Sequence, residues 1–320
     1  MNYSVTEFEN AAMFRLADQF DGLATGRNQV PSRRVSSSFR QEHTDPLWCQ
    51  THDVIVEKSG ALFQHFLASL PCILEEMCRV NAALARLQVV EGIEQNRQGH
   101  SFFALDAFDG SQARALTYIT KGAFASHTCS PNSGNQAFFE LYNECQQATF
   151  AQAPFFEAVK DHTKAGPKDA FDVIYETAAF QFYGKDRRKQ IDIADQALKD
   201  DGIMILLEKS LRGDPQLFEL EEDRKDDFHK TKYFSAQEIA WKKHQMLESM
   251  HDGLVELDDL LSVASERYEN ACVLWNGGNF FEIAACRDKS RLEKFTSLLG
   301  GICLDQGFDL DPQVGRWVTA

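Results

Sequence analysis

In the second half of the chain, short apolar runs alternate with longer stretches in which apolar and polar positions recur at helical spacing. The runs at 171–176 and 202–208 are nearly all apolar, as strands covered on both faces should be. Other short runs have the length of strands, and amphipathic segments separate them. We expect strands at 101–105, 122–128, 171–176, 202–208, 271–276 and 280–286, and helices at 111–120, 133–148, 185–199 and 235–250.

This alternation predicts an α/β fold with a doubly wound, mostly parallel sheet. A Gly-Gly-Asn turn signal at 277–279 separates the last two strands, so we expect an antiparallel C-terminal hairpin at the sheet edge. Ligands of such sheets bind beyond the carboxyl ends of the strands. The predicted cleft is therefore lined by 106–112, 128–132, 176–181 and 208–211.

The first hundred residues have a different pattern. The polar, basic and Ser-rich segment 26–41 is typical of a linker or an exposed arm. Helical spacing follows at 56–70 and at 71–93, with Pro71 suited to the first turn of the second helix. We predict an N-terminal arm and helical extension at 1–97, and an α/β domain at 98–320 with a helical insert at about 212–262.

Composition narrows the class of protein. The chain has 320 residues, of which 43% are hydrophobic and 25% charged, so it can bury a substantial core. A net charge of −15 argues against broad nucleic-acid binding, because an acidic surface repels phosphate. The sequence shows no secretory signal pattern and no apolar run of membrane-spanning length.

The eight cysteines form no CxxC pair and no cluster with zinc spacing, so we expect no metal site. Several of them lie in apolar runs, as in CILEEMC at 72–78. Buried free thiols fit the reducing environment of the cytoplasm, which is the location we predict.

The stretch SFFALDAFDGSQARAL at 101–116 carries the first candidate site. An apolar strand enters a short turn and becomes helix-like, which is typical of a strand leading into a nucleotide-binding loop. Of the glycines usual in such a loop only Gly110 is present, and Asp106 and Asp109 stand where small or neutral residues are usual. An ordinary Asp-Gly turn without a chemical role is the alternative.

Polar residues after later strands extend this candidate site. Ser130 and Asn132 can cap the following helix, contact a ligand, or do both. Glu176, Thr177 and Gln181 follow a buried strand, and a buried strand-end glutamate needs a partner. Glu176 is therefore our candidate for a catalytic base or a group that orients the acceptor.

Two segments carry a family resemblance. LLEKSLRGDPQLFELEEDRKDDFHKTKYFSAQEIAWKKHQMLESM at 206–250, followed by WNGGNFFEIAA at 275–285, resembles the C-terminal half of the carboxy-SAM synthase branch of the class I S-adenosylmethionine (SAM) methyltransferases. FDVIYETAAFQFY at 171–183 is similar to the fourth-strand region of that branch. The matching pieces are Glu208-Lys209, Phe234-Ser235 with Glu238-Ile239, and Asn279-Phe280.

The resemblance spans roughly residues 98 to 290 and implies SAM as the cofactor. It also implies that the helical insert covers the active site and supports a homodimer. The sequence departs from the family at Ala104 and at Cys129, where the family has acidic residues, and FAQAPFF at 150–156 lacks a further acid of the family. Around the position of an arginine in the branch, this sequence has Lys242, Lys243 and His244. The cofactor-binding residues that we predict are Asp106, Asp109, Gly110, Ser111, Cys129, Ser130, Asn132, Thr177 and Gln181.

Two functions follow from this interpretation. One is a SAM-dependent methyltransferase that acts on a small-molecule or protein acceptor, a reaction that needs little acid–base chemistry from the protein. The other is an inactive protein that keeps the methyltransferase fold as a scaffold or interaction subunit. A nicotinamide-dependent dehydrogenase is disfavoured because the loop lacks GxGxxG.

Overall fold

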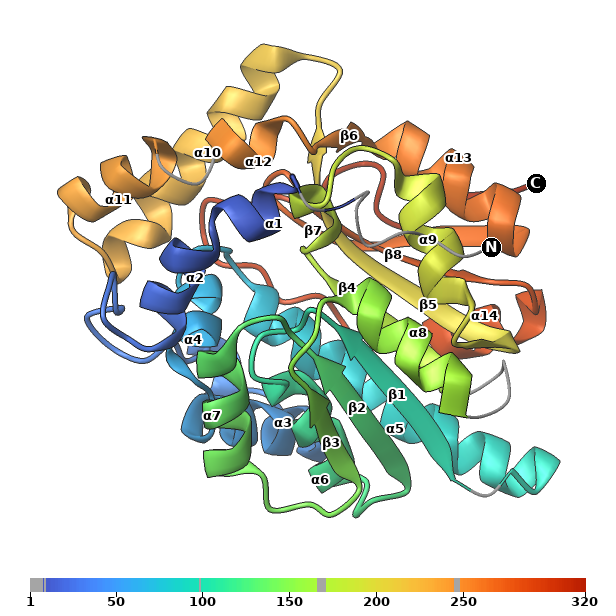
Figure 1. Cartoon of the computed structure of the whole chain (residues 1–320). Helices are drawn as coiled ribbons and strands as arrows, with labels where there is room; N and C mark the ends of the chain where they lie inside the picture. The colour runs from blue at the N-terminus through green and yellow to red at the C-terminus, as the bar shows by residue number, and fades with distance from the viewer. Residues whose placement is uncertain (1–7, 9, 98, 166–170, 245–247) are drawn as a thin grey trace.

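The computed structural model describes residues 8, 10–97, 99–165, 171–244 and 248–320 (Figure 1). Its centre is a mixed sheet with the strand order β3-β2-β1-β4-β5-β8-β7-β9, and β6 pairs with the end of β5. Strands β1 to β5 are parallel, and β8 is antiparallel to both β5 and β7. The predicted doubly wound sheet with an antiparallel C-terminal hairpin is confirmed, and this is a class I methyltransferase-like fold.

The strands have the following bounds: β1 His100–Leu105, β2 Phe124–Cys129, β3 Ala148–Ala151, β4 Phe171–Thr177, β5 Leu198–Leu211, β6 Val255–Glu256, β7 Asn270–Gly277, β8 Phe280–Cys286 and β9 Trp317–Thr319. Side chains of β1 alternate between two hydrophobic cores, with Phe102 on one face and Phe103 on the other. Both cores are covered by helices, which is why the central strands are almost entirely apolar.

The helices are α1 Ala12–Arg15, α2 Ala17–Ala24, α3 Pro46–Glu57, α4 Ala61–Leu67, α5 Ile73–Gln95, α6 Ser111–Ile119, α7 Ser133–Tyr142, α8 Phe155–Ala165, α9 Arg187–Asp195, α10 Pro215–Phe228, α11 Ala236–Lys242, α12 Glu248–His251, α13 Leu257–Tyr268 and α14 Lys289–Ser297. Short 3-10 helices are η2 Ser38–Gln41, η3 Phe180–Phe182 and η4 Lys230–Lys232. Helices α3, α5, α6 and α14 pack on one face of the sheet, and α8, α9 and α13 pack on the other.

Helix boundaries follow local capping chemistry. Asp45 accepts a hydrogen bond from the backbone N–H of Leu47, and Pro46 occupies the first turn, so α3 begins there. Ser235 and Glu238 form a reciprocal capping box at the start of α11. In the polar insert, this capping box fixes the residue at which α11 begins.

The amino ends of the parallel strands carry a buried ionic network. Arg291 contacts Glu91 through Nε at 2.7 Å, and His100 Nε2 lies 2.6 Å from Glu91 Oε2. Arg97 pairs with Asp172. These charges hold α5, α14 and the sheet together at the end opposite the predicted cleft.

Several predicted boundaries are wrong. The helix expected at 56–70 is divided into α3 and α4, because Gly60 interrupts it with an extended backbone. Pro71 precedes α5, whose N-cap is Cys72 with a φ of 61°. The helix expected at 133–148 ends at Tyr142, because its last residues form the connection to β3 and the start of β3.

The C-terminal half also differs from prediction in part. The hairpin β7–β8 forms as expected, but β9 pairs with β7, so the hairpin lies one strand inside the edge. The helix expected at 235–250 is seen as α11 and α12, and its residues 245–247 lie outside the described part of the chain. In the described residues, no helix combines the length and apolar character that a membrane span requires. The division at residue 97 stays a prediction, although residues from both segments share one core.

Candidate functional site

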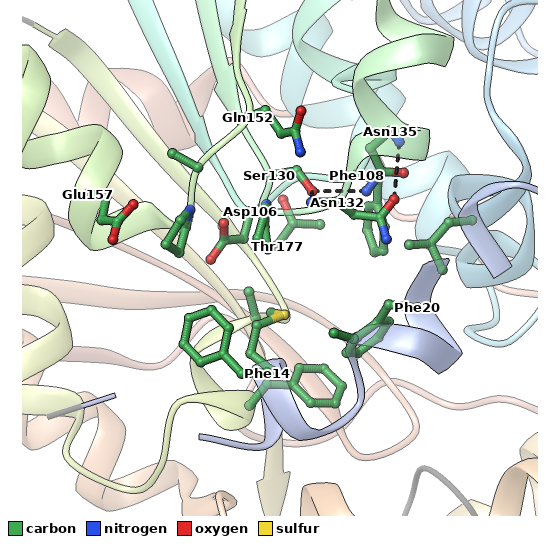
Figure 2. Close-up of a pocket in the computed structure, with 18 of the residues that line it drawn as sticks. Phe14, Phe20, Asp106, Phe108, Ser130, Asn132, Asn135, Gln152, Glu157 and Thr177 are labelled. Atoms are coloured by element: carbon green, nitrogen blue, oxygen red, sulfur yellow. Dashed lines mark hydrogen bonds between the residues drawn. The ribbon is translucent and has the colours of Figure 1, made fainter. Parts of the chain in front are cut away.

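A cavity of about 500 Å³ lies at the carboxyl ends of β1 to β4, where ligands of open α/β sheets bind. Figure 2 shows polar side chains from the strand ends along one side and the aromatic rings of Phe14 and Phe20 along the other. The rings belong to α1 and α2, which cover this end of the sheet (Figure 1). The polar and charged lining residues are Asp106, Ser130, Asn132, Asn135, Gln152, Glu157 and Thr177.

The loop between β1 and α6 has an unusual backbone. Asp106, Phe108 and Gly110 alternate in the left-handed region, with φ values of 45°, 54° and 69°. Glycine adopts this conformation without strain, whereas other residues rarely do. At Gly110 a Cβ would also lie 2.5 Å from Thr128 Oγ1, so this position accepts only glycine without rearrangement. The loop backbone thus has the conformation that glycine residues favour, although Asp106 and Phe108 occupy two of its three left-handed positions.

Asp106 is the charged group at the centre of the site. It is 7% exposed and lines the cavity, and its Oδ2 accepts a hydrogen bond from Tyr183 Oη at 2.7 Å. The backbone N–H of Phe155 also points to this oxygen. Burial raises the pKa of Asp106 to about 7, against the opposing effect of these hydrogen bonds. The carboxyl can therefore exchange a proton near neutral pH and would be held ionised by a cationic ligand.

The polar residues after β2 both cap the next helix and line the cavity, the two roles that the sequence left open. Asn132 Oδ1 accepts from the backbone N–H groups of Gly134 and Asn135 and so caps α7. Ser130 Oγ accepts from Asn135 Nδ2 at 2.9 Å. Ser130 and Asn132 also line the cavity, so structural capping and exposure to a ligand coexist at this strand end.

Thr177, at the end of β4, is the residue that most clearly lacks a partner. It is 2% exposed, and within the described part of the chain its Oγ1 has no hydrogen-bond partner. A buried hydroxyl without a partner is costly, and Thr177 lines the cavity. A ligand atom that accepts or donates a hydrogen bond here would satisfy it.

Sequence reasoning missed four contributors to the cavity. Gln152 and Glu157 follow β3, which was not predicted as a strand. Phe14 and Phe20 come from the N-terminal helices, 86 and 80 positions before His100, where the first strand begins. The amphipathic pattern of α2 is the signal that could have indicated a helix packed on the sheet end.

Asp109, Gly110, Ser111 and Cys129 are not among the residues that line the cavity. Asp109 points into the protein, where its carboxylate accepts from the Gly60 N–H at 2.8 Å, from Ser111 and from Arg114. These contacts tie the loop to the segment between α3 and α4. The expectation that Asp109 and Ser111 face a ligand is corrected by this geometry.

Cys129 is fully buried at the end of β2, and its sulfur lies 3.4 Å from the backbone nitrogen of Asp106. Burial raises the pKa of the Cys129 thiol well above its usual value, so it stays a neutral thiol. Cys129 thus packs against the loop between β1 and α6, while the next residue, Ser130, lines the cavity.

Glu176, the predicted catalytic residue, does not line the cavity. It is fully buried, and its Oε1 accepts hydrogen bonds from the backbone N–H groups of Ala179 and Phe180. Burial, and then the neighbouring Glu208 carboxylate, raise the pKa of Glu176 well above its usual value. Glu176 thus holds the turn after β4 through these hydrogen bonds, and its catalytic role stays a prediction.

Gln181 also lies away from the main cavity and instead lines a smaller one beside it. Its amide nitrogen donates to the backbone oxygen of Ala178 at 2.8 Å. Within residues 8–320, leaving out the segments that the structure does not describe, no three His, Cys, Asp or Glu side chains are grouped as metal ligands.

Comparison with known proteins adds context. No protein-family model and no curated protein matches the sequence. Similar solved structures include the plantazolicin methyltransferase BpumL with SAH (9% identity, 86% of this chain and 97% of that one, TM-score 0.46). The O-methyltransferase from Bacillus cereus with SAH is another (12% identity, 66% and 89%, TM-score 0.38). Similarity at this level carries no information on ligand or reaction, and the fold assignment rests on the strand order itself.

Proposed function

We propose that the protein binds SAM in the 500 Å³ cavity and transfers its methyl group to a small-molecule or protein acceptor. The observation that carries this proposal is the position of the cavity. It lies at the carboxyl ends of β1 to β4 in a methyltransferase-like sheet, directly beside the loop with three alternating left-handed residues.

The lining residues fit such a cofactor chemically. Asp106 offers a buried carboxyl to a positive group, and Thr177 offers a hydroxyl that lacks a partner. Gln152 presents an amide, which can both donate to and accept from the edge of a base. Phe14 and Phe20 supply the apolar surface that most small-molecule sites contain.

The reaction makes few demands on the protein. The sulfonium of the cofactor supplies an activated methyl group, so the protein has to position the acceptor and exclude water. Phe14 and Phe20 exclude water from the side opposite the strand ends. Asp106 would balance positive charge while the acceptor is held in place. Within the described residues, the only carboxylates that line the cavity are Asp106 and Glu157.

This role of Asp106 makes ligand affinity depend on pH. With its pKa at about 7, the carboxyl is partly protonated near neutral pH. A cation competes with that proton, so SAM affinity should rise as pH rises through about 7 and should stop rising above it. Asp106→Asn should weaken binding and remove the pH dependence, as measured by calorimetry on either side of pH 7.

The first test is calorimetric titration of the folded protein with SAM and with S-adenosylhomocysteine. Ser130→Ala and Thr177→Val should each weaken saturable binding by roughly fivefold, the effect of one hydrogen bond. Ser133→Ala is the matched control, because Ser133 is exposed on the same segment and does not line the cavity. Equal losses in all three variants would show that the cavity is not the binding site.

A scaffold protein with the same fold is the second candidate. Asp106 and Phe108 occupy positive-φ positions at which a side chain limits how closely a ligand can approach the backbone. If the folded protein binds neither SAM nor S-adenosylhomocysteine, the methyltransferase proposal is refuted and this alternative is favoured. A homodimer through the insert, and a location in the cytoplasm, stay predictions.

A further inference from the structure

A second, smaller cavity of about 90 Å³ lies beside the first. The two share the side chains of Phe20, Leu62, Phe108, Ala178 and Phe182 as walls. The second cavity lies beneath the helical insert, and Figure 1 shows α10 to α12 at the same end of the molecule as α1, α2 and α4. Its volume is enough for a few water molecules or one small polyatomic group.

Four lysines from four different elements line this small cavity. Lys209 comes from β5, Lys225 from α10, Lys230 from η4 and Lys242 from the last position of α11. The first three are at most 4% exposed, and Lys242 is half-buried with its ammonium group in the cavity wall. Four lysines around one small cavity are unusual, because lysine side chains are almost never buried unless they are paired.

Two carboxylates contact three of these four ammonium groups. Glu222 serves two of them, lying 3.0 Å from Lys209 Nζ and 2.6 Å from Lys225 Nζ. Lys230 pairs with Asp226 one turn earlier. Four lysines against these two acids leave a formal excess of two positive charges.

Lys242 is the lysine of this cluster whose amino group has no carboxylate partner among the described residues. Its Nζ donates to Ser69 Oγ at 2.5 Å, and among the described residues no carboxylate forms an ion pair with it. Burial, and then Lys230, Lys225 and Lys209, lower the pKa of Lys242 well below its usual value.

The same cause acts on Lys225, whose pKa burial lowers to about 7 despite the contact with Glu222. An ammonium group regains its charge when an anion enters its surroundings. Gln181 Oε1, which is buried and without a partner in the described structure, points to further unused hydrogen-bonding capacity at this cavity.

We infer that this lysine-lined cavity is the acceptor subsite and that it binds an anionic group, a carboxylate or a phosphate, of the molecule that is methylated. The inference rests on the proposed function, because it places the acceptor next to the SAM cavity. The shared walls bring an anchored acceptor within reach of the larger cavity, and Lys225, Lys230 and Lys242 of the insert line the smaller one.

Anion binding can be tested without knowing the acceptor. Inorganic phosphate and malonate are titrated into the protein at constant ionic strength, with and without S-adenosylhomocysteine. The variants are Lys242→Gln and the matched control Lys243→Gln, since Lys243 is the next residue and does not line the cavity. The two probes distinguish a phosphate ligand from a carboxylate ligand.

We expect the wild-type protein and Lys243→Gln to bind at least one probe, and Lys242→Gln to bind it at least about tenfold more weakly, because charge-assisted hydrogen bonds are strong. Lys242→Gln should fold normally, since it replaces a half-buried amino group that has no carboxylate partner among the described residues. Thermal unfolding of the variant checks this point.

Three results would overturn the inference. They are the absence of saturable binding of either probe to the wild-type protein, equal binding by Lys242→Gln, and a loss of S-adenosylhomocysteine affinity in Lys242→Gln as large as its loss of anion affinity. The last result would assign the lysines to the carboxylate of the cofactor itself. Probe binding without any binding of S-adenosylhomocysteine would refute the methyltransferase proposal and leave the anion site standing.

Discussion

Replacing Asp106 by Asn tests the electrostatics of the loop through folding stability alone, without any ligand. Asn has the same shape and can still accept hydrogen bonds from Tyr183 and from the backbone of Phe155. It cannot ionise, so the variant removes one proton equilibrium and little else. We expect the variant to become more stable than the wild-type protein as pH rises.

The magnitude follows from the shift in pKa from 3.8 to about 7. The native state holds the proton of Asp106 more tightly than the unfolded chain does, so this group stabilises the fold fully below pH 4 and loses that contribution as pH rises through 7. Roughly three pKa units at 1.36 kcal/mol each give an upper bound of about 4 kcal/mol between the two limits. The stability difference between variant and wild type should grow by up to that amount.

Urea unfolding of both proteins across this pH range measures the difference directly. Tyr183→Phe provides a second check, because removing the hydroxyl that donates to the carboxylate should raise the pKa of Asp106 further. The decline in stability should then still begin near pH 4 but continue to higher pH and become larger. Parallel pH profiles for wild type and Asp106→Asn would refute the reasoning and show that Asp106 is ionised at little cost.

Three further variants test the packing. Gly110→Ala forces a Cβ to 2.5 Å from Thr128 Oγ1 at a φ of 69°, so urea unfolding should show a loss of about 1–3 kcal/mol; an unchanged midpoint would mean that the loop relaxes freely. Gly253→Ala would place a Cβ 1.7 Å from the backbone oxygen of Gln181, so the backbone at one of these residues must move. We expect the free energy of unfolding to fall by at least about 2 kcal/mol, and an unchanged value would show that the insert packs loosely against the turn at Gln181. Arg291→Met removes the closest arginine from the buried Glu91 carboxylate, which keeps His100 as a partner, and should cost up to about 3–5 kcal/mol, whereas a stable variant would show that the network is dispensable.

The type of sheet, mostly parallel with an antiparallel hairpin, could be predicted from the sequence because its central strands are apolar runs bounded by turn residues. Strand β4 and the hairpin β7–β8 were found in this way. Strand β3 was missed because its four residues, ATFA, are too few to show alternation. Helices α13 and α14 were not predicted as separate helices either. They lie at the end of the predicted insert and directly after the hairpin.

The candidate site was predicted less well, for a geometric reason. The sequence identifies which residues follow the strands, and Asp106, Ser130, Asn132 and Thr177 do line the cavity. It does not show which way each side chain points when alternate residues adopt positive φ, and Asp109 turns inward for that reason. The aromatic cover from α1 and α2 depends on a long-range contact that local pattern cannot reveal.

The outermost strand of the sheet gives the tail of the chain a protective role. Strand β9 covers the edge of β7, whose eight residues are all buried, and Asp311 secures the approach through Arg212 and the side chain of Asn276. An uncovered apolar edge is a template on which another chain can add a strand. Proteolytic removal of this edge strand should therefore produce a protein that aggregates while its cavities are still intact.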